Sequence, residues 1–189
     1  MPEKFDASRK ARLDSPERRL LLDPDRILPL LPLKADQTVA DIGCGTGFFS
    51  LPLAQRLPRG KLYAVDVQPD MLDTVREKLA QAPSDNVETV LSSDTDIPLP
   101  RASLDGALLS LVLHENEDRH GFLSSVKALL RPGAWLAVLE WEKGETPSGP
   151  PQAERVSREE LRDVATQLGL VESLVTAVND RHYLMLFTC

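Results

Sequence analysis

The sequence has few cysteines and no long apolar run. Two of its 189 residues are cysteine, and Cys44 and Cys189 are too few for a disulfide framework and lack the spacing of a metal site. No apolar run approaches the ~20 residues that a membrane-spanning helix needs. The first residues are charged and contain no apolar stretch of signal-peptide length. We therefore expect a cytoplasmic protein without a membrane partner.

An excess of positive charge is also missing. The chain has 22 basic and 29 acidic residues, which gives a formal net charge of −7. Nucleic acids and anionic membrane surfaces are bound by concentrated basic faces, so neither partner is expected. The basic residues between positions 9 and 19, including Arg18 and Arg19, are interleaved with acids and are interpreted as a solvated face.

Short apolar segments alternate with segments of helical periodicity from residue 38 onward. Buried strands are expected at residues 38–42, 61–67, 87–91, 104–113 and 134–141. Helices are expected at residues 48–57, 69–80, 122–130 and 157–168. The last of these begins with Ser157 and has Glu160 three positions later, a capping-box pattern. Two further strands, 170–178 and 182–188, are separated by only three residues.

This order of segments predicts the topology of the sheet. Strands that are joined through helices run parallel with right-handed crossovers, whereas the last two strands have no helix between them and must be antiparallel. The expected fold is an α/β, doubly wound, seven-stranded sheet, mostly parallel with one antiparallel strand. Residues 1–35 precede it. Their Leu-rich stretch from Asp25 to Leu33 is expected to form one or two short helices lying against the domain, because Pro29 and Pro32 prevent a long one.

A glycine-rich turn follows the first strand. The sequence from Asp41 reads Asp-Ile-Gly-Cys-Gly-Thr-Gly-Phe, with glycines at 43, 45 and 47. In a doubly wound sheet this turn is where a nucleotide-like ligand lies, although a tight connection alone also explains it. Phe48 stands where a dinucleotide fingerprint has its third glycine, and Asp41 would repel a pyrophosphate. The pattern therefore favours a ligand that is uncharged or positive at this point.

An acidic residue ends the second strand. Asp66 lies 19 residues after Gly47, and a carboxylate at this place accepts both hydroxyls of a ribose in nucleotide-binding sheets. The alternative is that Asp66 caps the helix that opens at Pro69, a task that Asp70 also suits.

Together these residues resemble the class I S-adenosylmethionine-dependent methyltransferases, over almost the whole chain from residue 38 to 188. The resemblance implies S-adenosylmethionine as the cofactor and a methyltransferase domain over residues 36–189. Residues 1–35 are expected to form a helical lid segment, because this segment and the loop at residues 143–152 are the only pieces large enough to cover a site. It further implies that the turn packs against the methionine part of the cofactor through Asp41, Gly43, Cys44, Gly45 and Gly47, and that Asp66 holds the ribose.

The resemblance also implies an adenine site. Val67 and Met71 should flank the ring, and the acid that meets its amino group after the third strand is best matched by Asp94, with Thr95 beside it. Ser93 and Asp96 are alternatives, as is a solvated acidic loop.

The acceptor should approach the carboxyl end of the fourth strand, where His114 emerges. This histidine could be a general base, a donor that orients the acceptor, or a loop histidine with satisfied hydrogen bonds. Trp141 could stack on the acceptor or only pack. No histidine has a partner at metal-like spacing, so no metal is expected. The resemblance is closest to small-molecule methyltransferases of the ubiquinone/menaquinone and arsenite type, but the arsenic-binding cysteines are missing. The expected acceptor is a small molecule.

Two other functions stay open from the sequence. An NAD-dependent oxidoreductase is disfavoured by Phe48 and Asp41. A non-catalytic module that binds S-adenosylmethionine shares the same binding residues and is therefore not separated by them. The chain could be a monomer or a homodimer.

Overall fold

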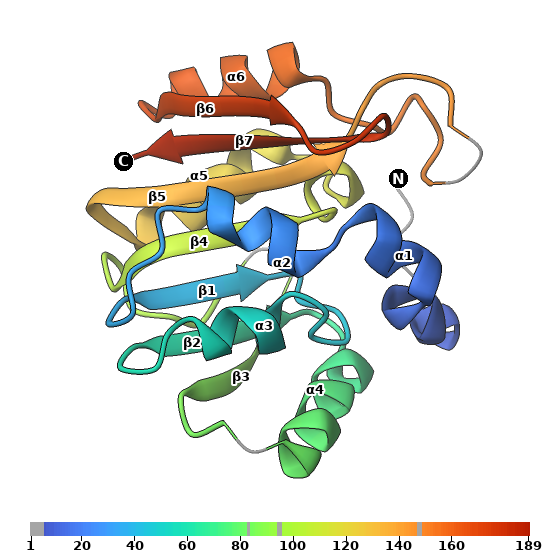
Figure 1. The fold of residues 1–189 in the computed structure, drawn as a ribbon. Coiled ribbons are helices and arrows are strands. Elements are labelled where there is room, and N and C mark those ends of the chain that lie inside the picture. The colour runs from blue at the N-terminus through green and yellow to red at the C-terminus, as the bar shows by residue number, and fades with distance from the viewer. Residues whose placement is uncertain (1–5, 83, 94–95, 147–148) are drawn as a thin grey trace.

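The computed structural model describes residues 6–82, 84–93, 96–146 and 149–189 (Figure 1). The strands are β1 (Thr38–Ile42), β2 (Lys61–Asp66), β3 (Val87–Leu91), β4 (Leu104–Ser110), β5 (Leu130–Trp141), β6 (Val171–Ala177) and β7 (His182–Thr188). The helices are α1 (Pro16–Leu21), α2 (Pro24–Ile27), α3 (Ser50–Gln55), α4 (Pro69–Gln81), α5 (Arg119–Leu129) and α6 (Arg158–Gln167). Short 3₁₀ segments cover Ala7–Asp14, Leu28–Leu30 and Leu113–Glu115. In these described ranges no helix has both the length and the apolar character needed to cross a membrane.

The seven strands form one sheet in the order β3-β2-β1-β4-β5-β7-β6. All neighbouring pairs are parallel except the two that involve β7, which is antiparallel to both β5 and β6. The predicted α/β sheet of seven strands with a single reversed strand is confirmed.

Helices cover both faces of this sheet (Figure 1). On one face, apolar residues of α2 and α3, among them Ile27 and Leu53, share a buried cluster with Val39 of β1. On the other face, Leu123 of α5 and Leu161 of α6 pack with the alternate side chains of the strands. Because β1, β2, β4 and β5 are parallel, their carboxyl ends meet at one edge, where a ligand is bound in sheets of this kind.

Two strands differ from the sequence prediction at their ends. β4 stops at Ser110 instead of residue 113, because Leu111 takes a positive φ of 58° and the chain turns into the 3₁₀ segment Leu113–Glu115. β5 begins at Leu130 instead of residue 134, and its register against β4 shifts after the first pair. Gly133, with φ 80°, provides the irregularity.

The helices begin and end near their predicted positions, with caps that explain the differences. α5 starts at Arg119 because the Asp118 side chain accepts a hydrogen bond from the Gly121 N–H at 2.8 Å. Ser157 caps α6 as predicted, accepting from the Glu160 N–H at 3.1 Å. The Glu160 carboxylate does not complete a capping box, since it pairs with Arg119 and Lys143.

Candidate functional site

The glycine turn leaves β1 at the carboxyl edge of the sheet. Gly43, Gly45 and Gly47 have positive φ angles of 74°, 53° and 81°. The N–H groups of Gly43 and Cys44 both donate to the Val65 carbonyl of β2, at 2.8 and 2.9 Å. These bonds hold the turn against the end of the neighbouring strand, and the left-handed conformations explain the spacing of the glycines.

Gly43 also brings the turn against the segment that carries His114. A methyl group at Gly43 would lie 2.5 Å from Cγ2 of Val112, which is closer than side-chain atoms approach one another. The absence of a side chain at Gly43 therefore lets the chain after β4 lie directly against the glycine turn.

We expect Gly43→Ala to lower the free energy of unfolding by about 3 kcal/mol, the sum of the left-handed backbone strain and the overlap with Val112. Gly133→Ala is the matched control. Gly133 has a similar φ of 80° with no atom within 4 Å of the added methyl group, so only the backbone strain should remain. Urea denaturation measures both. Equal losses in the two variants would contradict the close approach at Gly43.

Asp66 ends β2 directly beside the turn. Its Oδ2 accepts a hydrogen bond from the Gly45 N–H at 2.8 Å, and its Oδ1 accepts from the Gln68 N–H at 2.9 Å. The carboxylate thus holds both the glycine turn and Gln68, the residue before α4, but it does not cap the helix, because α4 has no side-chain cap hydrogen bond. A carboxylate has about four acceptor positions, which is the chemistry that the expected contact with two ribose hydroxyls requires.

Asp41 is buried at the end of β1, with 1% of its surface exposed. The Ser50 hydroxyl of α3 donates to its Oδ2 at 2.6 Å. Burial raises the pKa of Asp41 to about 6, an effect that the nearby Asp66 reinforces and that Ser50 and Arg18 oppose. A buried carboxylate with a raised pKa gains from a cation placed beside it.

Asp41→Asn should raise the stability of the ligand-free protein at neutral pH. The raised pKa means that the folded state binds this proton more tightly than the unfolded chain, so the stability of the wild type falls as the pH rises from about 4 to about 6. At pH 7.5 the cost is at most about 3 kcal/mol. Thermal melts of both proteins at pH 4 and pH 7.5 check this. We expect a higher melting temperature for the variant at pH 7.5 and little difference at pH 4; a difference of equal size at both pH values would contradict it.

Three of the other residues predicted to contact the cofactor can be placed in the described part of the chain. Val67 follows it and is partly exposed, whereas Met71 in the first turns of α4 is 2% exposed. Cys44 is buried beside Leu72 and Val75 of α4, and its burial raises the pKa of the thiol. Asp94 and Thr95 lie outside the described residues.

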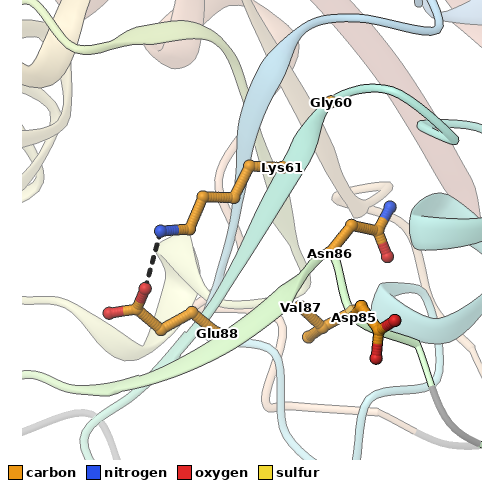
Figure 2. Close-up of a pocket in the computed structure, with 6 residues that line it drawn as sticks. All are labelled: Gly60, Lys61, Asp85, Asn86, Val87 and Glu88. Atoms are coloured by element: carbon orange, nitrogen blue, oxygen red, sulfur yellow. Dashed lines mark ion pairs between the residues drawn. The ribbon is translucent and has the colours of Figure 1, made fainter.

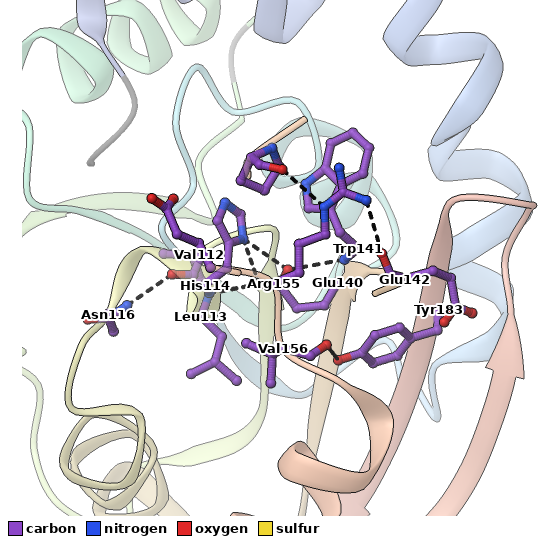
Figure 3. Close-up of polar contacts among 12 residues, drawn as sticks. Val112, Leu113, His114, Asn116, Glu140, Trp141, Glu142, Arg155, Val156 and Tyr183 are labelled. Atoms are coloured by element: carbon purple, nitrogen blue, oxygen red, sulfur yellow. Dashed lines mark hydrogen bonds and ion pairs between the residues drawn. The ribbon is translucent and has the colours of Figure 1, made fainter. Parts of the chain in front are cut away.

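His114 and Glu140 form a buried pair at the same edge (Figure 3). Nδ1 of His114 donates to the Glu140 carboxylate at 2.9 and 3.1 Å, and the exposed fractions of the two residues are 7% and 0%. The carboxylate also accepts from the backbone N–H groups of Leu113, His114 and Trp141 at 2.9–3.2 Å. Glu140 therefore shapes the turn after β4 and fixes the orientation of the imidazole ring.

This pairing determines the chemistry available to His114. Burial lowers the pKa of its imidazole, but the charge of Glu140 and the hydrogen bond to it raise the pKa more, so the net pKa lies above the usual value. Because Nδ1 carries the proton shared with Glu140, the other nitrogen, Nε2, is the atom that can take up a proton. Nε2 makes no hydrogen bond within the described part of the chain, and Figure 3 shows it directed away from Glu140.

Trp141, at the end of β5, packs against protein side chains. Its ring lies 4.2 Å from the His182 ring and 5.3 Å from the Arg155 guanidinium. These contacts are the packing role that the sequence left open for Trp141 as the alternative to stacking on the acceptor.

The N-terminal segment lies over the glycine turn. Lys78 of α4 donates to both carboxylate oxygens of Asp14 and to the Thr46 carbonyl, each at 2.8 Å. A methyl group at Gly45 would lie 3.1 Å from Leu13. Arg18 of α1 lies over the Phe48 ring at 4.9 Å. The interpretation of Arg18 as part of a solvated face is therefore wrong, although Arg19 beside it is exposed.

Several polar atoms at this edge are fully buried without a hydrogen-bond partner in the described ranges: Arg18 Nε, Thr46 Oγ1 and Ser110 Oγ. Buried polar groups are nearly always paired in proteins, so unpaired ones next to a glycine turn fit a site for a polar ligand. The roles of Arg18, Ser50 and Glu140 were not predicted from the sequence.

A surface hollow of about 500 Å³ lies at the opposite edge of the sheet (Figure 2). It is lined by the start of β2 and β3, where Lys61 pairs with Glu88 at 2.7 Å. The pair is exposed, and none of the residues predicted for the cofactor or acceptor lines the hollow. In the described ranges, no group of three or more histidine, cysteine, aspartate or glutamate side chains is placed to hold a metal ion.

Comparison with known proteins identifies the family of this chain. A family model described as "Methyltransferase domain" matches residues 39–133. The structure of an S-adenosylmethionine-dependent methyltransferase from Aquifex aeolicus has 33% sequence identity and a TM-score of 0.92, with 98% of this chain and 99% of that chain covered.

Curated relatives match over a shorter length. The biotin biosynthesis bifunctional protein BioHC of Teredinibacter turnerae is 30% identical over 54% of this chain and 19% of its own length. The demethylmenaquinone methyltransferase of Listeria monocytogenes is 27% identical over 64% of this chain and 51% of its own. The match thus spans about half, or less, of these relatives. With a family model over half of the chain and a relative matched along its whole length, the chain belongs to the family of S-adenosylmethionine-dependent methyltransferases.

Proposed function

We propose that this chain transfers the methyl group of S-adenosylmethionine to a small-molecule acceptor, and that His114 removes the proton of the acceptor. The observation that carries the proposal is the buried Glu140–His114 pair beside the glycine turn. A carboxylate that orients an imidazole and stabilises its protonated form is the arrangement of a general base.

The cofactor would lie along the turn and the end of β2. It supplies an electrophilic methyl group on a positively charged sulfur. Asp66 would accept the ribose hydroxyls, and the buried charge of Asp41 would favour the positive methionine end. We further propose that Gly43, Cys44, Gly45 and Gly47 contact the methionine part, and that Val67, Met71, Asp94 and Thr95 surround the adenine.

The proposed acceptor is small because the N-terminal segment would cover the site. Residues 1–35 would act as a lid on the methyltransferase domain, residues 36–189, and Lys78 ties the lid to α4 through Asp14. A closed site excludes water and holds the acceptor against the methyl group, which is the main source of rate in an in-line displacement. The Listeria relative is named for a small-molecule acceptor, which supports the same class.

Two measurements test this function. Calorimetry should detect binding of S-adenosylhomocysteine and no binding of NAD. Tritium from methyl-labelled S-adenosylmethionine should then be transferred to one of a set of fractionated small-molecule pools, and not to protein or nucleic acid. Absence of binding would refute the cofactor; binding without transfer to any pool would favour a non-catalytic module instead.

A further inference from the structure

Arg18 lies beside the glycine turn, and none of the described carboxylates forms an ion pair with it. Its side chain is partly buried, and its Nε has no exposed surface and no hydrogen-bond partner. Within the described residues its guanidinium makes no ion pair, and the aromatic face of Phe48 at 4.9 Å is its contact. Arg19, the next residue, lies on the exposed side of α1 and approaches Asp25 at 3.8 Å.

The acids nearest to Arg18 are already engaged elsewhere. Asp14 binds Lys78 through both oxygens, and Asp41 accepts from Ser50. Burial lowers the pKa of Arg18 to about 10, against the opposing effect of these two carboxylates. Burying a guanidinium without a hydrogen-bonded anion costs free energy. A ligand that places an anionic group beside Arg18 would offset this cost.

The position of Arg18 is held from two sides. Leu22, four residues later, is 2% exposed and belongs to the core cluster, and the Leu21 carbonyl accepts from the Asn179 side chain at 2.6 Å. On the other side, Asp14 is bound to α4 through Lys78. Phe48 immediately follows Gly47, so the guanidinium is placed beside the end of the turn that faces the methionine part of the proposed ligand.

We propose that Arg18 binds the carboxylate of the amino-acid part of the cofactor. This inference rests on the proposed function. The amino acid is a zwitterion. Asp41, which is buried, would face its positive end, and Arg18, whose Nε is buried without a partner, would face its negative end. The planar guanidinium suits a carboxylate because it can donate two parallel hydrogen bonds. The lid segment is thereby part of the cofactor site as well as a cover.

The test compares two ligands that differ in the amino-acid part. S-adenosylhomocysteine carries the carboxylate, whereas 5′-methylthioadenosine keeps the nucleoside and the sulfur without it. We expect Arg18→Gln to weaken the binding of S-adenosylhomocysteine by roughly 10- to 100-fold in calorimetry, with the affinity for 5′-methylthioadenosine unchanged. Arg18→Lys should fall between wild type and Arg18→Gln, and Arg19→Gln should behave as wild type.

The outcomes separate this inference from the proposed function. If wild type binds neither ligand, the proposed function fails and the role of Arg18 with it. If wild type binds both and Arg18→Gln binds S-adenosylhomocysteine equally well, only the role of Arg18 is overturned. An equal loss for both ligands overturns it too, because the effect would then come from the shape of the site. Circular dichroism of each variant shows that it is folded.

Discussion

Asp66→Ala should weaken the binding of S-adenosylhomocysteine by about 10²- to 10⁴-fold, the largest effect on affinity that we expect from one side chain. Two hydrogen bonds to a charged acceptor would be lost, each contributing about 1.5–3 kcal/mol. The Gly45 N–H loses its partner as well, which loosens the turn. Calorimetric titration of wild type and variant measures the change.

Asp70→Ala provides the matched control. Asp70 is also an acid at the start of α4, but it is exposed. Its removal should leave the affinity unchanged. The 2′-deoxy analogue of S-adenosylhomocysteine gives a second check, since wild type should bind it more weakly and Asp66→Asn should discriminate less between the two ligands. If Asp66→Ala retains the wild-type affinity, Asp66 does only the structural work of holding Gly45 and Gln68.

His114→Gln should lower kcat by about 10²- to 10⁴-fold for an acceptor that must lose a proton, with the affinity for S-adenosylhomocysteine unchanged. A histidine that acts as a general base must be neutral, and the pKa of His114 is raised. The rate of wild type should therefore increase with pH through a pKa above that of free histidine. A rate that falls over the same range would mean that the protonated ring is needed, as in the donor role left open by the sequence.

Glu140 can be tested without knowing the acceptor. In NMR titrations of the imidazole signals, Glu140→Gln should lower the pKa of His114, because the buried charge that stabilises the imidazolium is removed while burial remains. Because the pKa of His114 is raised in the folded state, protonation of this residue stabilises the fold. This contribution to the free energy of unfolding is complete below the pKa of the histidine in the unfolded chain and is lost as the pH rises through its pKa in the folded state. An unchanged pKa of His114 in this variant would contradict the pairing.

The Glu140 variant itself should be less stable. Of the two terminal atoms of glutamine, only the amide oxygen can accept a hydrogen bond. At least one of the buried N–H groups of Leu113, His114 and Trp141 therefore loses its partner, at a cost of about 1–3 kcal/mol. Glu142→Gln is the control, because Glu142 lies on the same rim and is only partly buried. Its effect on the pKa of His114 should be small.

Local patterns in the sequence determined the order of elements, the parallel sheet with one reversed strand, and the place of the glycine turn and Asp66. Each depends on residues close together in the chain: apolar periodicity, glycines at alternate positions, and an acid at the end of a strand. The end of β4 and the start of β5 were not predicted correctly, because they depend on hydrogen bonds and register between strands.

Only the tertiary structure decided which polar side chains meet. Glu140 reaches His114 across 26 residues because β4 and β5 are neighbours in the sheet, and Ser50 reaches Asp41 because α3 packs back over β1. Arg18 reads as a surface residue from its charged neighbours, yet the anchoring of α1 turns it toward Phe48. Such pairs depend on how separate elements are placed in space. The spacing of residues within one element does not predict that placement.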